Sequence, residues 1–375
     1  MKNQKGTIKV SGLENKIDFQ IERYDFIEEI KGENCIYIFG AGSLADTITV
    51  KLRECGIHCF GALVDKKYYK GGATVNGIKV YEWESFVPEC NIVVVMAMSD
   101  MKRGLEIEKR EFVKKVVYPG CVGFENDKLL DESYLRENLG QYEDMLKKLA
   151  DISSKEILST WINSCLSRYN PMIFPFCNDK VGYFNRIDLQ FSEIGSYINI
   201  GAYTGDTIEE FLLVNNMYDR IYAIEIDEKM NSYLERKYKN DKRINVVKKA
   251  FWNYEGEIIV AQCDNANSVG SIIKNSGNGN RIKCITLDQY FTEDKGKIDL
   301  ISIALRGQEN VLAGGGKLIK RDHPMIVAKV GFERDGVIKV INTIYEIDSS
   351  YAFYLRFKDN RTEELTVYAV RKGNL

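Results

Sequence analysis

The residues NIGAYTGD, at positions 199–206, could form a ligand-binding turn between a strand and a helix. Two glycines, Gly201 and Gly205, follow the apolar residues 197–198 and precede a helix-like stretch at 207–213. Glycines in such a turn let the backbone approach a ligand closely. Glu225 comes 24 residues after Gly201, at the end of the next expected strand, where a carboxylate can accept hydrogen bonds from a ribose diol.

The glycine spacing of this turn narrows the choice of ligand. Gly201 and Gly205 form G-x-x-x-G, which differs from the G-x-G-x-x-G of dinucleotide sites, and no Gly-Lys-Ser/Thr follows as in a P-loop. Because a pyrophosphate cradle is missing, a phosphate-free nucleoside such as S-adenosylmethionine fits better than NAD. The alternative is an ordinary strand-to-helix turn that binds no cofactor.

A second glycine turn, GAGSLA at 40–45, does fit the dinucleotide pattern. Gly40 and Gly42 follow an apolar strand, and Asp65 comes 23 residues after Gly42 at the end of the next strand. This pattern predicts a nucleotide or nucleotide-sugar site, and a tight turn without a ligand is the alternative. Residues 35 to about 120 resemble the N-terminal domains of bacterial sugar-modifying acyltransferases and related nucleotide-sugar proteins.

The elements around both turns alternate between strand and helix, which predicts an α/β protein. We expect a Rossmann-like domain at 1–125, a helical connector at 126–190 and a second Rossmann-like parallel-sheet domain at 191–375. The expected strands are 35–39, 57–65, 91–98 and 113–119 in the first domain and 197–200, 220–226, 244–250, 281–286, 298–305 and 325–330 in the second. Residues 351–357 and 365–370 predict a C-terminal hairpin, and NSGNGN (275–280) predicts a flexible loop.

The connector carries one apolar stripe, formed by Leu135, Leu139, Tyr142, Leu146 and Leu149 at helical spacing. Core packing between the domains is the favoured interpretation. A helix that binds a partner or forms a homo-oligomer is the alternative.

Composition excludes several classes of protein. The 375 residues have a net charge of -2, with 45% hydrophobic and 28% charged residues, so nothing indicates nucleic acid or an anionic membrane as a partner. The apolar runs are too short to span a bilayer, and MKNQKGTIKV has no apolar core, so we expect no signal peptide. Nine cysteines and two histidines show no metal-ligand clustering, so we expect no metal, no Ser-His-Asp or Cys-His hydrolase, and reduced thiols in a cytoplasmic protein.

A family resemblance joins several of these segments. The motifs that carry it are YINIGAYTGDTIEEF, IYAIEID, VKKAFWNYEG, ITLDQYF and IDLISIALRGQENVLAGGGKLIK, with LADISSKEIL and GYFN upstream. From about residue 147 to 370 the chain resembles the FkbM-type S-adenosylmethionine-dependent methyltransferases. The resemblance implies a class I methyltransferase-like seven-stranded sheet whose final strand is antiparallel.

The resemblance also implies a cofactor site. Gly201, Tyr203 and Gly205 would line the methionine part of the cofactor, beside Asn199, and Asp206 would begin the following helix. Glu225 would bind the ribose, with Asp227 just beyond it. Phe251 and Trp252 would flank the adenine, although Trp252 is equally explained as a core residue.

The chain departs from the family pattern at the positions where an acceptor proton would be taken. Asn199 stands where an aspartate is usual, Ser302 to Gly307 replaces a Lys-x-Asp-x-Glu-Gly stretch, and histidines near 331–332 and 357 are missing. Neither Asn199 nor Ala304 can act as a base, and Arg306 stays protonated. Arg306 suits an anionic ligand such as a phosphate or carboxylate, or it points to solvent or pairs with Glu309.

Three interpretations follow. The first is a methyltransferase that modifies a hydroxyl of a sugar, glycan or natural product, and it is the one we favour. The second is a degenerate methyltransferase that binds a ligand or partner without catalysis. The third is a nucleotide-sugar-binding module that acts through Gly40, Gly42 and Asp65.

Overall fold

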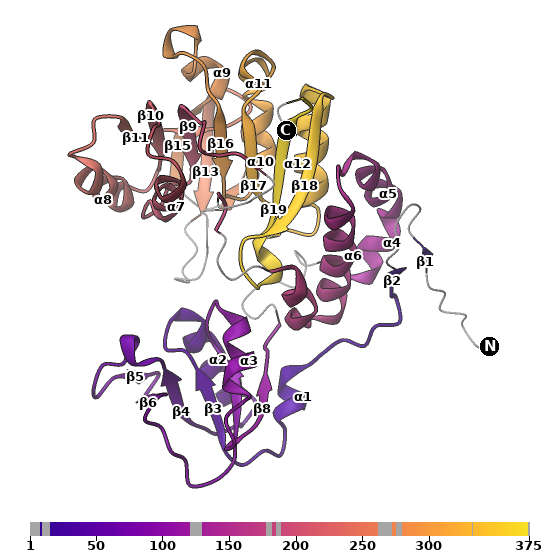
Figure 1. Cartoon of the computed structure of the whole chain (residues 1–375), viewed down its shortest axis with the longest axis vertical. Coiled ribbons are helices and arrows are strands. Elements are labelled where there is room, and N and C mark those ends of the chain that lie inside the picture. The colour runs from indigo at the N-terminus through magenta and orange to yellow at the C-terminus, as the bar shows by residue number, and fades with distance from the viewer. Residues whose placement is uncertain are drawn as a thin grey trace. The chain divides into compact units, whose positions relative to one another are not determined.

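The computed structural model describes residues 8–9, 16–120, 130–177, 182–184, 189–261, 272–274, 280–331 and 333–373. The chain forms two compact units (Figure 1). The N-terminal unit comprises Met1–Ser133, Leu158–Cys177 and Asp359–Thr362, and the C-terminal unit comprises Tyr134–Ile157, Asn178–Lys358 and Glu363–Leu375. The helical segment at 126–190 is therefore divided between the two units. The loop predicted at 275–280 falls almost wholly outside the described residues.

The N-terminal unit contains a six-stranded sheet in the order β5-β6-β4-β3-β7-β8. All its pairs are parallel except β5–β6. All five residues of β7 are buried, as expected for a parallel strand covered on both faces. The strands are β3 (Ile36–Phe39), β4 (Cys59–Val64), β5 (Thr74–Val75), β6 (Ile78–Glu82), β7 (Ile92–Met96) and β8 (Val113–Val117), and the helices are α1 (Phe26–Ile30), α2 (Ser43–Glu54) and α3 (Gly104–Ile107). A short antiparallel pair, β1 (Ile8–Lys9) and β2 (Lys16–Ile17), precedes them.

The C-terminal unit contains a seven-stranded sheet in the order β11-β10-β9-β16-β17-β19-β18. Its strands are β9 (Ser196–Ile200), β10 (Arg220–Ile224), β11 (Ile244–Val247), β16 (Leu300–Ile303), β17 (Met325–Lys329), β18 (Tyr351–Phe357) and β19 (Leu365–Arg371). Only β19 runs antiparallel to its neighbours, β17 and β18. The predicted hairpin and the predicted antiparallel last strand are both confirmed.

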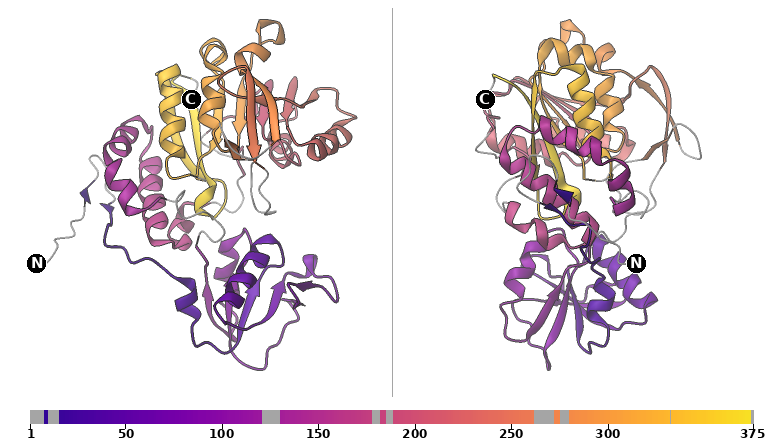
Figure 2. Two further views of the ribbon diagram at one scale, coloured as in Figure 1. Left: turned by 180° about the vertical axis from the view of Figure 1, so that it is seen from behind. Right: turned by 90° about the vertical axis from the view of Figure 1, so that its right-hand side faces the viewer.

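The helices from residue 132 onward are α4 (Glu132–Glu137), α5 (Leu139–Lys148), α6 (Ile152–Ser167), α7 (Asp206–Val214), α8 (Glu228–Tyr238), α9 (Leu287–Tyr290), α10 (Gln308–Ala313), α11 (Gly316–Asp322) and α12 (Gly336–Ile347). Most of them belong to the C-terminal unit, whereas α6 lies mainly in the N-terminal unit. Helix α12 packs along the hairpin of β18 and β19 (Figure 2). The stripe predicted in the connector is buried at Leu135, Tyr142, Leu146 and Leu149, which agrees with core packing.

One strand predicted for the main sheet lies elsewhere. Residues 281–286 form β15 (Asn280–Ile285), which belongs to a separate four-stranded sheet in the order β12-β15-β13-β14. Its other strands are β12 (Ala250–Phe251), β13 (Gly256–Ala261) and β14 (Ile272–Lys274). The strand expected at 244–250 therefore divides, with β11 in the main sheet and β12 in the small one.

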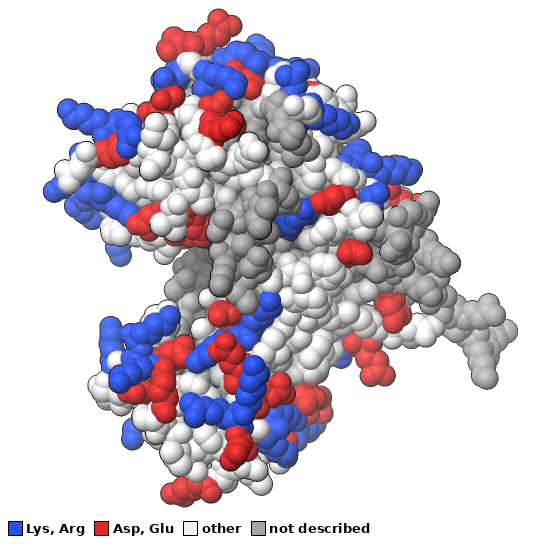
Figure 3. Space-filling model, in the orientation of Figure 1, with Lys and Arg blue, Asp and Glu red and all other residues white. Residues whose placement is uncertain are grey.

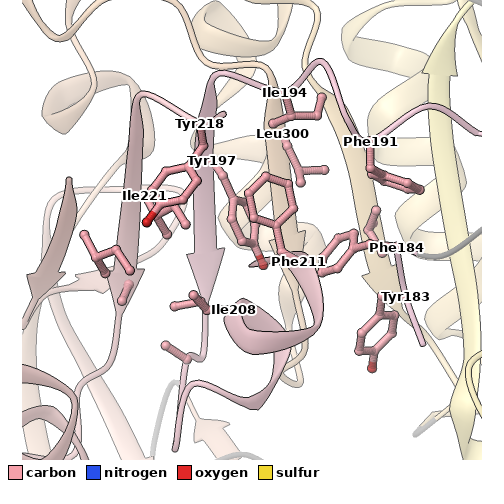
Figure 4. Close-up of a cluster of buried hydrophobic side chains, with 14 of the residues drawn as sticks. Tyr183, Phe184, Phe191, Ile194, Tyr197, Ile208, Phe211, Tyr218, Ile221 and Leu300 are labelled. Atoms are coloured by element: carbon pink, nitrogen blue, oxygen red, sulfur yellow. The ribbon is translucent and has the colours of Figure 1, made fainter. Parts of the chain in front are cut away.

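Aromatic residues dominate the core between β9 and the helix that follows it (Figure 4). Tyr197 of β9 packs against Phe211 of α7 with ring centroids 4.8 Å apart, and Phe184 contacts both rings. This packing fixes α7 against the sheet and so fixes the turn that joins them. Burial of side chains of this size contributes on the order of 2 kcal/mol each.

The cysteines differ from the expectation of uniformly reduced thiols, because Cys35 and Cys90 form a disulfide in the N-terminal unit. Five other described cysteines form no disulfide; Cys55 is exposed, and Cys59, Cys165, Cys177 and Cys284 are buried.

Among the described residues, none of the helices has the length and apolar character that a membrane span requires. On the face shown in Figure 3, basic and acidic side chains are interspersed over each unit.

Candidate functional site

The turn after β9 requires glycine at its end. Gly201, Tyr203 and Gly205 all have positive φ angles, of 81°, 48° and 78°. A Cβ atom on Gly205 would lie 2.3 Å from Tyr238 Oη, so no larger residue fits without displacement. Tyr203 holds a conformation that is strained for a tyrosine, yet its side chain is 60% exposed. Residues held in such backbone conformations cluster at active sites and ligand-binding sites.

The turn is tied to the neighbouring strand β10 by backbone hydrogen bonds. Gly201 N and Ala202 N donate to Ile224 O at 3.0 and 2.9 Å. These bonds place the turn directly beside Glu225, the first residue after β10. The two segments that the sequence paired by spacing are therefore in contact.

Glu225 is the central polar residue of this site. Its side chain is buried, Oε2 accepts a hydrogen bond from Tyr203 N at 2.8 Å, and Oε1 accepts one from Asp227 N at 2.8 Å. Burial raises the pKa of Glu225, and the backbone N–H donors partly oppose that rise. Each carboxylate oxygen retains a lone pair beyond its backbone bond, so the group can still accept from two hydroxyls.

The two aspartates predicted for the site lie at helix starts and are exposed. Asp206 is the first residue of α7. Asp227 is the N-cap of α8, and its side chain accepts a hydrogen bond from Met230 N at 2.9 Å. The carboxylate of Asp227 therefore already has a structural role, and its contact with a cofactor stays a prediction.

The two aromatic residues predicted to flank adenine are both buried. Phe251 packs against Tyr290 and Phe291 with ring centroids 5.5 and 5.9 Å away. The Trp252 ring lies against Gly307, where a Cβ atom would come within 2.7 Å of it. Core packing explains the burial of both residues. Trp252, which directly follows β12, also packs against the turn that follows β16.

Asn199 lies under the glycine turn and is 2% exposed. Its Nδ2 donates to Ser302 Oγ at 2.7 Å, and the same oxygen lies 2.6 Å from Tyr197 Oη. Asn199 Oδ1 is buried and has no hydrogen-bond partner among the residues that the structure describes. An amide can neither take a proton here nor carry a charge, so this position is a polar contact point and not a base.

Arg306 follows β16 in the turn before α10, next to Gly307. It is partly buried. Burial raises the pKa of Glu333, a residue in the segment after β17, and the charge of Arg306 is one of the two that oppose this rise. No ion pair joins Arg306 to Glu309 within the described residues; instead Glu309 lies 3.9 Å from Lys339 Nζ and accepts from Asn310. The alternative in which Arg306 pairs with Glu309 is therefore not found among the described residues.

Sequence reasoning missed Glu333 and two ion pairs at the ends of β17 and β18. Lys329 and Glu364 form a buried pair, and Lys358 Nζ lies 3.0 Å from Glu210 Oε1 of α7. Burial disfavours the charge on Lys358, but Glu210 outweighs that effect and the pKa of Lys358 is raised. The sign of the Lys329 pair in the sequence was the position of this residue, because Lys329 is a charged residue at the end of an otherwise apolar strand.

The second predicted site lies in the N-terminal unit. Gly40 has a φ of 129°, and a Cβ there would lie 2.2 Å from Ala97 O, so this glycine serves close packing with the end of β7. Gly42 is the N-cap of α2, and a Cβ there would meet no atom within 4 Å. Asp65 pairs with Arg103 at 2.8 Å, so its carboxylate is already occupied. A nucleotide site at these residues stays a prediction.

No group of three or more potential metal-ligating side chains occurs in the part of the chain that the structure describes.

The strand order of the C-terminal unit, with β19 as its one antiparallel strand, is that of a class I methyltransferase fold. Among solved structures, the chain is similar to a methyltransferase FkbM from Methylobacillus flagellatus, with a TM-score of 0.62 and 16% identity over 92% of each chain. The resemblance inferred from sequence is confirmed at the level of the fold. The match also extends beyond residues 147–370, to which the sequence motifs were confined.

Other solved structures match about half of the chain. They include an Aeropyrum pernix fibrillarin with bound S-adenosyl-L-methionine (14% identity, 49% of this chain and 70% of that one, TM-score 0.31). They also include an rRNA methylase from Streptococcus thermophilus (12% identity, 48% and 91%, TM-score 0.29). No family model matches the sequence, and no curated protein matches it.

Proposed function

We propose that this protein is an FkbM-type methyltransferase that transfers the methyl group of S-adenosylmethionine to a hydroxyl of a sugar, glycan or natural product. The observation that supports it most is the position of Glu225. A buried carboxylate, oriented by two backbone N–H groups, lies beside a glycine turn at the ends of adjacent parallel strands. Ligands of open α/β sheets bind at that edge.

The arrangement around Glu225 suits a nucleoside better than a phosphate. A carboxylate repels phosphate, whereas it accepts hydrogen bonds from both hydroxyls of a ribose. The backbone bonds to Tyr203 N and Asp227 N hold the carboxylate in place before the ligand arrives. Pre-orientation reduces the entropy lost on binding.

The rate of methyl transfer depends mainly on the alignment of the two reactants. The acceptor oxygen must approach the methyl carbon in line with the carbon–sulfur bond, and holding two reactants in that geometry can supply about 7–11 kcal/mol of the barrier reduction. The positive-φ turn from Gly201 to Gly205 would hold the methionine part, and Glu225 would hold the ribose. The substrate class rests on the family resemblance.

Calorimetry with S-adenosylmethionine and S-adenosylhomocysteine tests the proposal. We expect both to bind the wild-type protein, and Glu225→Ala to weaken binding about 10- to 100-fold, because the ribose hydroxyls lose a charged acceptor. Glu228→Ala is the matched control, since Glu228 is an exposed acid of α8 paired with Lys248. Absence of heat with either ligand at millimolar concentration would contradict the proposal.

A non-catalytic binding protein is the second candidate, and the side chain at 199 favours it. Asn199 and Ala304 offer no base, and Tyr197 is held neutral because burial raises its pKa. Methyl transfer therefore requires a proton acceptor from elsewhere in the site. If S-adenosylmethionine binds and no acceptor hydroxyl is ever methylated, this second candidate replaces the first.

A further inference from the structure

The C-terminal end of α8 contacts the glycine turn that follows β9. Lys237 Nζ donates a hydrogen bond to Thr204 O at 2.7 Å, and Tyr238 Oη donates one to Gly205 O at 3.1 Å. The ring of Tyr238 also packs over Gly205, where a Cβ atom would lie 2.3 Å from the tyrosine hydroxyl. Two consecutive carbonyl groups of the turn are therefore held by the last two residues of one helix.

The N-terminal end of the same helix is tied to the first half of the turn through Glu225. Tyr203 N donates to the Glu225 carboxylate at 2.8 Å, and Asn231 Nδ2 of α8 donates to Glu225 O at 3.2 Å. The turn is thus held at two places. The segment before α8 fixes Tyr203, and the end of α8 fixes Thr204 and Gly205.

The bonds to the two carbonyl groups set the direction of the peptide groups in the turn. In a trans peptide, the C=O of one residue and the N–H of the next point to opposite sides. The peptide between Thr204 and Gly205 is fixed on both sides, because Gly205 N donates to Ala202 O at 2.7 Å. In the next peptide Gly205 O faces Tyr238, whereas Asp206 N donates to no group within the described residues. That N–H is left to a ligand on the side of the turn that faces away from Tyr238.

The two bonds are not needed to attach α8 to the sheet. Leu234 is fully buried in the core of the unit and provides that attachment. Burial raises the pKa of Tyr238 well above its usual range, so the hydroxyl stays protonated and can donate. Lys237 also pairs with Glu209 at 2.8 Å, but the Glu209 side chain is exposed, and exposed ion pairs contribute little to stability.

We propose that Lys237 and Tyr238 are positioning residues for the cofactor, which hold residues 204–206 in the form that binds the amino-acid part of S-adenosylmethionine. This inference rests on the proposed function and adds two residues that act on the ligand through the turn. The ribose is held separately by Glu225, whose bond to Tyr203 N does not involve the end of α8. Removal of either side chain should therefore weaken binding of the amino-acid part and leave binding of the nucleoside part unchanged.

The test compares two ligands by calorimetry on the full chain. One is S-adenosylhomocysteine, and the other is methylthioadenosine, which keeps the nucleoside and the sulfur but lacks the amino-acid part. The ratio of their Kd values measures what the amino-acid part contributes to binding. The variants are Lys237→Met, Lys237→Arg and Tyr238→Phe, and Lys239→Met is the matched control because Lys239 is the exposed C-cap of the same helix.

We expect the wild type to prefer S-adenosylhomocysteine. Lys237→Met should reduce this preference about 10-fold, since a charged donor is lost, and Tyr238→Phe about 3-fold, since a neutral donor is lost. Lys237→Arg retains a charged donor and should keep most of the preference, and Lys239→Met should keep all of it. Affinity for methylthioadenosine should stay at the wild-type value in every variant. Tyr238→Phe keeps the ring over Gly205, so it tests the hydrogen bond even if Lys237→Met unfolds.

Glu209→Gln separates the two partners of Lys237. It removes the ion pair but leaves the bond to Thr204 O, so the ligand preference should persist. A loss of preference in Glu209→Gln as large as that in Lys237→Met would overturn the role of the bond to Thr204.

An unchanged ratio in both Lys237→Met and Tyr238→Phe, or an equal loss of affinity for both ligands, would overturn the proposal, because the two residues would then serve the fold alone. Glu225→Ala behaves differently, since it should weaken both ligands and keep their ratio. A wild-type protein that binds neither ligand would contradict the proposed function itself, whereas binding with an unchanged ratio in the variants would contradict this inference only.

Discussion

Individual residues that follow strands of the C-terminal unit can be tested by their effect on stability. Glu333 is an acid whose pKa is raised in the folded protein. The folded state therefore holds its proton to higher pH than the unfolded state, and stability is lost as pH rises through that window. Above this pH window Glu333 is charged in both states, and the loss of folding free energy no longer changes with pH.

Glu333→Gln should therefore stabilise the protein at pH 7.5 and leave it unchanged near pH 4. We expect a rise in Tm of about 1–3 °C at the higher pH, followed by circular dichroism. Asp144→Asn is a suitable control: this exposed acid pairs with Lys147, which lowers its pKa, so the substitution should not stabilise the protein at high pH. A Glu333→Gln variant with lower Tm at pH 7.5 would show that the carboxylate has a structural partner.

Among the elements, the turn between β9 and α7 depends most on one residue. Gly205→Ala should destabilise the C-terminal unit by about 2–4 kcal/mol, because the added Cβ meets Tyr238 Oη and the φ of 78° is unfavourable. Gly56→Ala separates the two effects. Gly56 follows the C-cap of α2 with a φ of 70°, and a Cβ there would meet no atom within 4 Å, so we expect a loss of about 1 kcal/mol in the N-terminal unit. Equal losses in urea unfolding would contradict the steric argument.

Local patterns predicted those elements whose role depends on neighbours in the sequence. The turn at 199–206, its contact with Glu225 and the C-terminal hairpin were all visible in spacing and alternation. The assignment of β15 to a second sheet could not be predicted from the sequence. A strand of alternating residues can pair with either sheet, and long-range packing determines which one it joins. Glu333 was missed because its loss of solvent contact arises from folding, and the loop sequence carries no sign of it.

At the scale of the whole molecule, the two predicted ligands are expected to bind different units, so the effect of each ligand on stability can be measured separately. S-adenosylhomocysteine at 100 times its Kd should stabilise the wild type by about 2.7 kcal/mol. Gly42→Val should keep that shift, since Gly42 lies in the N-terminal unit, and Glu225→Ala should lose most of it. Differential scanning calorimetry measures both.

The same experiment with nucleotide sugars tests the third interpretation. Gly42 leaves open space at the start of α2, which favours a ligand, whereas the Asp65–Arg103 pair occupies the acid that would hold a ribose. A thermal shift with a nucleotide sugar that disappears in Gly42→Val would assign a ligand to the N-terminal unit. A shift that survives in this variant would place the ligand elsewhere.

The measurement that tests the central claim most directly is a crystal structure with S-adenosylhomocysteine bound. We predict that both ribose hydroxyls donate to the Glu225 carboxylate at about 2.7 Å. We also predict that the homocysteine part lies along the turn from Gly201 to Gly205. A ligand found away from Glu225, or no ligand after soaking at millimolar concentration, would contradict the account.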